Sequence, residues 1–418
     1  MSTSTADSST PAPGFQKMAL LLALGWSLTN IAYAIYDLPL KLVLKKELLL
    51  NPQQLSGFIA LGVISNYFKP FAGILIDSVP LFGTRRRWYL LCSLFLCGVG
   101  WLVLGIVPRQ YWIMLVTFAI TYTMVMVIST TLGGLMVETA QRFQAAGRLT
   151  AQRIAMFKIG LLAGGPIGGY LAKLPLLVTM SCTASLHFIL LPIVWLRLRE
   201  PEKAHLDRQV WQTAGRQLHS LWESKVVLAA AGMIFLIAAS PGFGTPLLFY
   251  QTDTLKFDSV FLGMLTLTGA AFGLLAALVY YRACVRFSMK WMLVGSIIIH
   301  ALGTLFYLFY HNPTTALAIT ALEGVTQALA LLPVYDLAAR GTPKGSEALG
   351  YALMMSVWNL TTSLSDWVGS SLIVKFHLTF DNLVWLNAGT TALVLLVVPF
   401  LPATLLKQKD HQGITEVL

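Results

Sequence analysis

Long apolar stretches alternate with short polar connections along almost the whole chain. A helix needs roughly 20 mainly apolar residues to cross about 30 Å of hydrocarbon, so each stretch predicts a membrane-spanning helix. The pattern predicts an all-α integral membrane protein with twelve transmembrane helices, near residues 18–38, 55–76, 88–107, 112–136, 150–171, 174–196, 226–250, 259–281, 290–310, 314–336, 347–374 and 382–403.

The longest polar connection, residues 197–225, divides these helices into six and six. Trp211, Leu218 and Trp222 recur in it at helical spacing, which indicates an amphipathic helix on the inner membrane surface. No connection is long enough to hold a separate catalytic domain. The predicted units are a disordered N-terminal tail (1–17), a six-helix bundle (18–196), a cytoplasmic linker (197–225), a second six-helix bundle (226–403) and a C-terminal tail (404–418).

The composition agrees with a membrane protein and indicates its orientation. The chain is 56% hydrophobic, with a mean hydropathy of +0.71, which lies outside the range of soluble domains. The net charge of +11 comes from basic residues between apolar segments rather than from a basic aromatic face, so no nucleic-acid partner is expected. If the N-terminus is cytoplasmic, 19 of the 29 lysines and arginines fall on cytoplasmic segments. The positive-inside rule then predicts that both termini are cytoplasmic.

Motifs of enzyme chemistry are absent from the sequence. It contains no HExxH zinc motif, no nucleophile elbow and no phosphate-binding loop. The seven histidines are dispersed, and Cys92, Cys97, Cys182 and Cys284 have neither metal-ligand nor redox spacing. We therefore expect no enzyme activity, no cofactor and no metal site.

The segment 73–90, GILIDSVPLFGTRRRWYL, places an acid and three arginines in one short connection on the predicted cytoplasmic side. Positive-inside topology alone explains the arginines but not Asp77. An acid at this position can receive basic groups and helix N-terminal amides from the other half, forming a latch that breaks when the halves move. We predict that Arg153 joins this network through Glu138 or Asp77, and the alternative is that it is a topological flank of its span. The residues that we assign to this cytoplasmic gate are Lys69, Asp77, Arg85, Arg86, Arg87, Glu138, Arg142 and Arg153.

Ionisable residues inside a membrane span are costly and are candidates for function. At about 1.5 Å per residue, Lys158 and Glu323 both lie near the middle of their spans. Glu323, with Gln327 one turn further on, must be protonated, paired or hydrated, and we predict that it carries a coupling proton or binds the donor edge of a heterocycle. Lys158 suits an anionic substrate. The alternative is a structural pair between Glu323 and Lys158 or another basic residue.

Polar side chains form stripes on two other predicted spans. Asn30, Tyr33 and Asp37 share one helical face, and Asn359 and Asp366 share another. We predict that these residues line the substrate path, with Asp37 as a second candidate for proton coupling. Helix packing is the alternative for the asparagines, and solvation near the membrane surface is the alternative for the aspartates.

Two patterns concern the backbone. Gly160, Gly164 and Gly168 recur every four residues, which predicts a surface where two helices approach closely. The stretch SPGFGTP, residues 240–246, predicts an interrupted helix and a hinge of the extracellular gate.

Four stretches carry a resemblance to a known family. The run that starts at Lys69, K-P…G…D-S-x-P-x-F-G-x-R-R-R, resembles the loop motif of the major facilitator superfamily in the form of the folate-biopterin transporter family. VETAQRFQAAGRL, SPGFGTPLLFYQTDTLKFDSVFLG and PKGSEALGYALMMSVWNLTTSLSDWVGSSL are similar to that family too. The corresponding loop of the second half, RACVRFSMK, departs from the motif because it lacks the acid.

The resemblance implies two six-helix halves that rock about a midplane site, and a secondary active transporter of a folate-like or pterin-like organic anion. We expect alternating access with proton coupling, a monomer in the bacterial inner membrane, and only a small-molecule substrate and the lipid bilayer as partners. Two alternatives stay open: a cation-coupled sugar or drug carrier, and a non-transporting assembly or pigment-delivery protein of the same fold.

Overall fold

The computed structural model describes residues 13–143, 145–200, 208–286, 288–340 and 347–401. In these ranges the secondary structure is helical, with one isolated bridge between Leu81 and Thr84. Helix α1 begins at Pro13, so its first five residues fall within the predicted N-terminal tail of 1–17. The C-terminal tail predicted at 404–418 lies outside the described residues.

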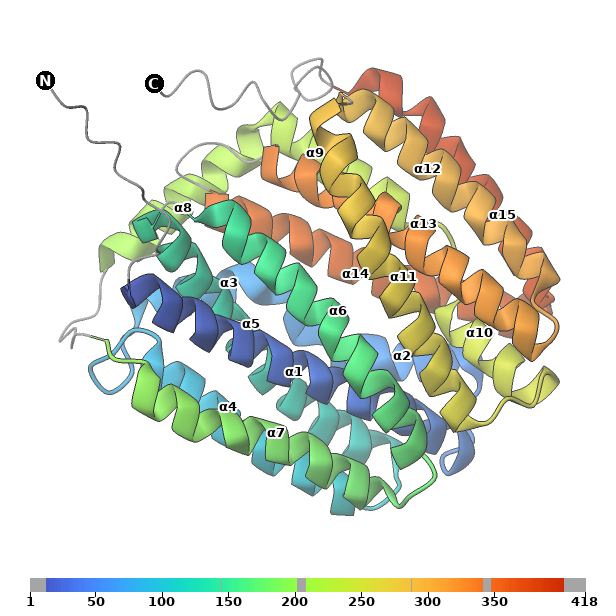
Figure 1. The fold of residues 1–418 in the computed structure, drawn as a ribbon, viewed down its shortest axis with the longest axis horizontal. Coiled ribbons are helices and arrows are strands. Elements are labelled where there is room, and N and C mark those ends of the chain that lie inside the picture. Colours follow the sequence, from blue (N-terminus) through green and yellow to red (C-terminus); the bar gives the residue numbers. More distant parts are fainter. Residues whose placement is uncertain (1–12, 144, 201–207, 287, 341–346, 402–418) are drawn as a thin grey trace, which may run out of the picture.

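Helices α1 to α7 form a first group, seen at the lower left of Figure 1. Their bounds are α1 Pro13–Lys46, α2 Pro52–Gly62, η1 Ile64–Phe68, α3 Lys69–Ser78, α4 Arg87–Ile106, α5 Tyr111–Phe143, α6 Ala146–Leu171 and α7 Leu176–Arg197. Helix α8, Arg208–Glu223, leads to the second group. The second group contains α9 Lys225–Ala238, α10 Gly244–Phe249, the π-helical turn η2 Tyr250–Thr254, α11 Ser259–Arg286, α12 Met289–Leu305, η3 Phe306–Phe309, α13 Pro313–Arg340, α14 Glu347–Phe376, α15 Phe380–Leu393, η4 Val394–Leu396 and η5 Val398–Phe400.

Each predicted span coincides with one helix or with helices in series. Eight helices are long and apolar enough to cross a membrane, or up to ten if each of two bent pairs counts as one span, within the residues that the structure describes. One bent pair is α2 with η1 and α3, which turn by 46°. The count of twelve and the cytoplasmic location of the termini stay predictions.

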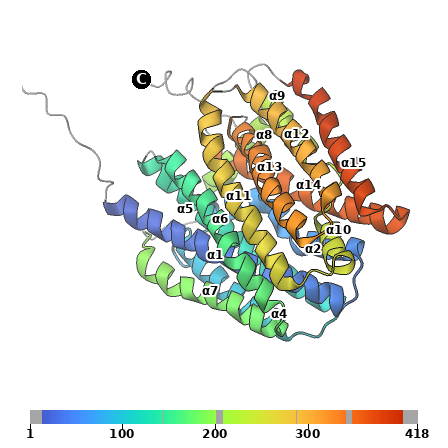
Figure 2. The same ribbon diagram turned by 45° about the vertical axis from the view of Figure 1, so that its right-hand side comes forward.

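Helix packing is dense within each group and also joins the groups. In the first group α1 packs along α6 and α7, and α4 packs along α5 and α7. In the second group α11 packs along α13, and α12 packs along α13 and α15. The groups meet where α6 lies beside α11 and where α2 lies beside α14 (Figures 1 and 2).

The glycines of α6 explain how it can lie between two neighbours. A Cβ on Gly164 would stand 2.5 Å from the Cβ of Ala34 on α1. A Cβ on Gly169 would stand 2.5 Å from the carbonyl oxygen of Ser259 on α11. Real side chains do not come this close, so only glycine allows either contact. The predicted close packing surface is confirmed, and a second one faces the other group.

Helix α8 lies across the end of the bundle where α1 starts (Figure 1), at 74° to α9. Its apolar side packs inward, because Leu221 is 1% exposed and lies with Leu218 against Ile74 of α3. Trp222, predicted on the same face as Leu218, is 76% exposed. The side chain of Trp211 lies outside the described residues. The amphipathic helix is present, and its inward face is centred on the leucines.

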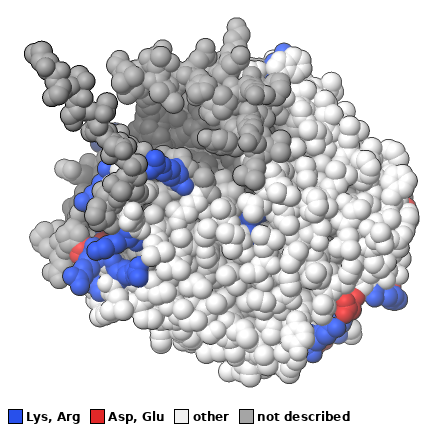
Figure 3. Space-filling view, viewed as in Figure 1, with Lys and Arg blue, Asp and Glu red and all other residues white. Residues whose placement is uncertain are grey.

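Charge is concentrated at the ends of the helices. Figure 3 shows lysine and arginine gathered at two ends of the visible face, with few charges on the broad band between them. Large apolar side chains such as Phe95 and Ile120 are exposed on this molecule. Such a surface suits lipid and identifies a multi-pass membrane protein. We call the end that carries Arg85, Arg86 and Arg87 the basic end.

Candidate functional site

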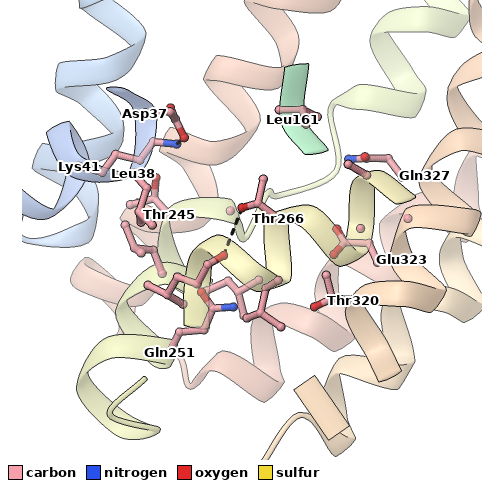
Figure 4. A pocket seen from close by; sticks show the side chains of 18 of the residues that line it. Asp37, Leu38, Lys41, Leu161, Thr245, Gln251, Thr266, Thr320, Glu323 and Gln327 are labelled. Atoms are coloured by element: carbon pink, nitrogen blue, oxygen red, sulfur yellow. Dashed lines mark hydrogen bonds and ion pairs between the residues drawn. The ribbon is translucent and has the colours of Figure 1, made fainter. Parts of the chain in front are cut away.

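A cavity of about 310 Å³ lies between the two groups. Helices α1 and α6 of the first group and α10, η2, α11, η3 and α13 of the second group supply its walls. Its charged and polar lining residues are Asp37, Lys41, Lys158, Thr245, Gln251, Thr266, Tyr307, Thr320, Glu323 and Gln327. Figure 4 shows Asp37 and Lys41 on one side, Glu323 and Gln327 on the other, and Thr245 and Thr266 between them.

The break between α9 and α10 brings Thr245 to this cavity. The sequence predicts an interruption there, and the chain leaves the helix after Ala238 and resumes it at Gly244. Its backbone groups find protein partners: Gly242 N–H donates to Ser365 O at 2.9 Å, and Asn387 Nδ2 donates to Pro241 O at 2.9 Å. Non-helical backbone at membrane depth persists only with such partners, so the predicted interruption is confirmed.

Asp366 belongs to this break rather than to the cavity wall. Its carboxylate accepts hydrogen bonds from the backbone N–H of Thr245 at 2.9 Å and from the Thr245 hydroxyl at 2.5 Å. These bonds satisfy donors at the start of α10 and fix the position of Thr245. The structure therefore does not place Asp366 among the lining residues, although the sequence suggests it as a substrate contact.

Glu323 is half-buried on the α13 wall and accepts a hydrogen bond from the hydroxyl of Tyr307. Tyr307 belongs to η3 and is 2% exposed. A carboxylate at membrane depth needs such a donor, because an unpaired charge in an apolar environment is strongly unfavourable. The alternative predicted from the sequence, an ion pair with Lys158, is not formed in the structure, although both side chains are described and line the same cavity.

Lys158 reaches the cavity from α6 beside a glycine of α11. A Cβ on Gly273 would stand 2.9 Å from Lys158 Nζ and 3.1 Å from Gly324 O, so glycine leaves room for the ammonium group. Lys158 forms no ion pair with any side chain that the structure describes. An ammonium group without a carboxylate partner in a cavity of this kind can bind an anion.

Asp37 and Lys41 form an ion pair on α1, with 2.8 Å between Lys41 Nζ and Asp37 Oδ2. Their side chains are 30% and 27% exposed, so both stay accessible from the cavity. The sequence suggests Asp37 for this region but gives no sign of Lys41. Asp37 is thus partly exposed, as the solvation alternative predicts, and it also forms an ion pair with a lysine one helical turn away.

The remaining stripe residues lie outside the cavity wall. Asn30 packs against α6, where its Cβ is 2.5 Å from the position a Cβ of Gly160 would take. Tyr33 packs edge-on against Tyr36, with 5.7 Å between ring centroids. Asn359 is half-buried on α14 and is not one of the lining residues. The predicted stripes thus contribute Asp37 to the cavity, while Asn30 follows the packing alternative.

At the basic end, Arg86 is the centre of an ion-pair cluster. It is 4% exposed, donates to Asp77 Oδ1 at 2.8 Å through Nη2, and donates to Glu138 through Nη1. Arg85 lies 3.4 Å from the same two acids. Glu200, which the sequence did not suggest, accepts from the backbone N–H groups of Arg86 and Arg87 at 2.8 Å. An acid at this helix start offsets the unpaired N–H groups of α4.

The cluster differs from the predicted latch in one respect. The acids bind arginines of their own group, whereas the prediction paired Asp77 with the other half. Arg153 lies over the ring of Trp26 at 4.7 Å rather than with Glu138 or Asp77, and Arg142 lies over Phe143 at 5.3 Å. Lys69 is half-buried at the start of α3.

Lys45 joins the two groups at the end opposite the basic end. From the last turn of α1 its ammonium group binds Asp253 and Thr252 of η2. The same group lies 4.2 Å from the ring centroid of Phe249. The side chain of Lys45 is only 10% exposed, whereas that of Asp253 is 58% exposed, so water reaches the contact from the acid's side.

A second ion pair joins the groups at the same end. Lys173 follows α6 and lies 2.8 Å from Asp258, which precedes α11. Asp258 also accepts the backbone N–H of Phe261 at 2.9 Å. The hydrogen bond from Lys173, together with that N–H, lowers the pKa of Asp258 below its usual value. Among the residues that the structure describes, every ion pair between the groups lies at this end.

Comparisons with known proteins agree on a transporter. A family model described as the BT1 family matches residues 30–416. The chain is 30% identical over 428 residues to a protein named folate-biopterin transporter from Synechocystis sp., covering 94% of this chain and 85% of that one. It is 22% identical to folate transporter 1 of Plasmodium falciparum, covering 81% and 70%.

Solved structures show the fold. The crystal structure of a D-xylose–proton symporter matches with a TM-score of 0.70 at 16% identity, covering 93% of this chain and 98% of that chain. A peptide transporter structure matches with a TM-score of 0.70 at 11% identity, covering 93% and 95%. At these identities the likeness concerns the arrangement of helices alone.

Proposed function

The chain belongs to the BT1 family and is a membrane transporter rather than an enzyme, and we propose that it carries a small organic anion with a pterin-like ring in a proton-coupled cycle. The observation that carries this proposal is the cavity between the groups. One wall offers the Lys158 ammonium group without a carboxylate partner among the described residues, and another offers the Glu323 carboxylate.

The basic end is taken to face the cytoplasm, because arginine and lysine prefer that side. Both termini are then cytoplasmic, and the Lys45 and Lys173 contacts lie on the outside. The proposed moving units are the bundles 18–196 and 226–403. The outer ion pairs hold one state of alternating access and must break in the other.

The substrate is proposed to span the two sides of the cavity. The carboxylate of Glu323 and the amide of Gln327 can accept hydrogen bonds from the ring N–H and amino groups of a pterin. Lys158 can bind an anionic group of the same molecule. The volume of about 310 Å³ is at the small end of ligand pockets, which run from about 300 to 1,000 Å³. This favours a compact ring compound over an extended conjugate.

Glu323 is proposed to carry the coupling proton, and Asp37 is the second candidate. Protonation of Glu323 removes a charge from the cavity and weakens its bond with Tyr307. Asp37 forms an ion pair with Lys41 at 2.8 Å, one helical turn away. The lysine stabilises the ionised form of Asp37, which therefore has less tendency to take up a proton. This difference makes Glu323 the better candidate.

One observation favours a second candidate, a carrier of neutral polyols such as sugars. Neutral hydrogen-bonding groups outnumber charges on the cavity wall, with Thr245, Gln251, Thr266, Thr320 and Gln327 all present. Sugar sites use such groups together with aromatic side chains. A ligand screen separates the two candidates, because a ligand that binds the folded state raises the melting temperature.

The test uses purified protein in proteoliposomes with labelled biopterin, folate or xylose, with and without an imposed pH gradient. We expect gradient-driven uptake of a pterin, lost in Glu323→Gln while exchange of pterin across the membrane persists. Asp381→Asn is the matched control, since this exposed acid at the start of α15 does not line the cavity. Unchanged gradient-driven uptake in Glu323→Gln refutes the coupling role. Uptake of xylose alone supports the second candidate, and no uptake or thermal shift with any compound supports a non-transporting role.

A further inference from the structure

Tyr307 contacts Glu323 and also the aromatic residues around the broken helix. Its ring stacks on Tyr310, with 5.4 Å between centroids and 22° between planes. It also meets Phe243 edge-on at 5.0 Å, in the segment between α9 and α10. The ring is 2% exposed and is packed on two sides, so it cannot move without displacing these neighbours.

Tyr310 extends these contacts to η2. Its hydroxyl accepts a hydrogen bond from Gln251 Nε2 at 2.7 Å, and both side chains are buried. Gln251 is followed in the same π-helical turn by Thr252 and Asp253, which bind Lys45 of the first group. A continuous series of direct contacts therefore leads from Glu323 to the ion pair between the groups.

We propose that Tyr307 is the positioning residue through which the protonation state of Glu323 controls the Lys45 contact between the two helix groups. This inference rests on the proposed role of Glu323 as the proton carrier. The ionised carboxylate accepts a charge-assisted hydrogen bond from Tyr307, which holds the stacked tyrosines and Gln251 in place. A proton from cavity water converts Glu323 to a neutral acid, and the bond from Tyr307 becomes an ordinary one. The tyrosine stack then loosens, and with it the support of η2.

Other titratable groups around Glu323 leave this assignment intact. On its own helix the neighbouring lining residues, Thr320 and Gln327, are neutral. Helix α11 contributes Thr266, also neutral. On α12, His300 lies one turn before Gly303, which packs against α13. The remaining charged or titratable groups on described elements are Lys158 of α6 and Asp37 and Lys41 of α1 on the cavity wall, Tyr307, Tyr310 and Tyr250 in the aromatic cluster, and Asp366 of α14, which is bonded to Thr245.

The experiment measures the separation of the groups without any substrate. Spin labels are placed at Lys46→Cys and Thr254→Cys, two exposed positions beside the Lys45 contact, in a background free of the native cysteines. We expect the label distance in the otherwise unmodified protein to change with pH around one midpoint. Tyr307→Phe removes only the hydroxyl, so the ionised carboxylate loses its donor, and the midpoint moves up by about 1 to 2 pH units.

Tyr250→Phe is the matched control. Its ring stacks on Phe380 at 4.6 Å in the same aromatic cluster, and its hydroxyl has no hydrogen bond among the described residues. The control should keep the original midpoint. Glu323→Gln, which resembles the neutral acid, should hold the low-pH distance at every pH and provides a second variant if Tyr307→Phe does not fold.

Two results overturn the inference: a label distance independent of pH in the protein with intact Tyr307, or a Tyr307→Phe midpoint equal to that of Tyr250→Phe. A failure of the proposed function is distinguishable, because it would appear as absent pterin uptake while the distances still respond to pH. A merely structural role of Tyr307 would lower the melting temperature without moving the midpoint.

Discussion

Replacing Lys45 with methionine would remove the charge that joins α1 to η2 while keeping an apolar side chain of similar length. Asp253 is 58% exposed, so its ion pair contributes only roughly 0.5 kcal/mol. The cation–π contact with Phe249 at 4.2 Å contributes about 1 kcal/mol, since the lysine is mostly buried. The hydrogen bond to Thr252 adds about 0.5 kcal/mol.

In the proposed alternating-access cycle, these contacts together stabilise the state that is closed at this end by about 2 kcal/mol, which corresponds to a factor of about 30 in the equilibrium between closed and open states. The assay is the rate at which a membrane-impermeant maleimide, added from the Lys45 side, labels Thr320→Cys inside the cavity. In the proposed cycle this end must open before the reagent reaches Thr320→Cys, so the rate should rise by about 30-fold in Lys45→Met.

Lys46→Met is the control for this experiment, because Lys46 is exposed and shows none of these contacts among the described residues. A labelling rate within about twofold of the original, or an equal increase in both variants, would refute the reasoning. A double-mutant cycle with Asp253→Asn then isolates the ion pair, for which we expect a coupling of about 0.5 kcal/mol.

Three further predictions concern stability, measured by thermal unfolding of the purified protein. Gly169→Ala should cost about 1 to 3 kcal/mol, because its Cβ would stand 2.5 Å from a backbone oxygen of α11. Gly295→Ala, with nothing within 4 Å, should be neutral or stabilising, and equal effects would contradict the packing argument. Arg86→Ala should cost about 2 to 3 kcal/mol, since it leaves two acids without their most buried cation; a loss below about 0.5 kcal/mol would show that the cluster is not structural. Asp258→Asn should cost roughly 0.5 kcal/mol at pH 7, because the Lys173 pair is about half exposed on both sides. Because folding lowers the pKa of Asp258, the stability difference between the original protein and Asp258→Asn is present above about pH 4 and disappears as the pH falls through the folded-state pKa. A stability difference that persists in strong acid would contradict this prediction.

The sequence predicted the features that depend on local composition. The length of the apolar stretches alone located the helices. The prolines and glycines of residues 240–246 located the break, because a proline lacks a backbone N–H and interrupts the helix at its own position. Lys158 and Glu323 were predicted as site residues because a charge at membrane depth is costly whichever helix its span packs against. In the structure both side chains line the cavity.

Contacts between distant segments could not be predicted in this way. Lys45 and Asp253 are separated by 208 positions, and in the sequence each is an ordinary charge at the end of an apolar stretch. The pairing of Asp77 illustrates the same limit at shorter range. The sequence marked this acid as unusual, but only the fold shows that its cation is Arg86 of the same helix group.

The cavity lies between the two helix groups, whereas the ion pairs that join the groups lie at one end of the molecule. The carboxylate of Glu323 lies inside, where its charge depends on a single hydroxyl donor, and the Lys45 pair lies at one end, where it is partly screened by water. In the proposed cycle, a proton that enters the cavity changes an interaction in a low-dielectric environment, and such an interaction is stronger than a contact screened by water. For this reason a small number of buried polar groups can set the balance between two states that are otherwise joined by weak pairs. In the proposed cycle the glycine contacts of α6 with α11 would have to separate and close again, and backbone that packs closely without charge suits such a surface.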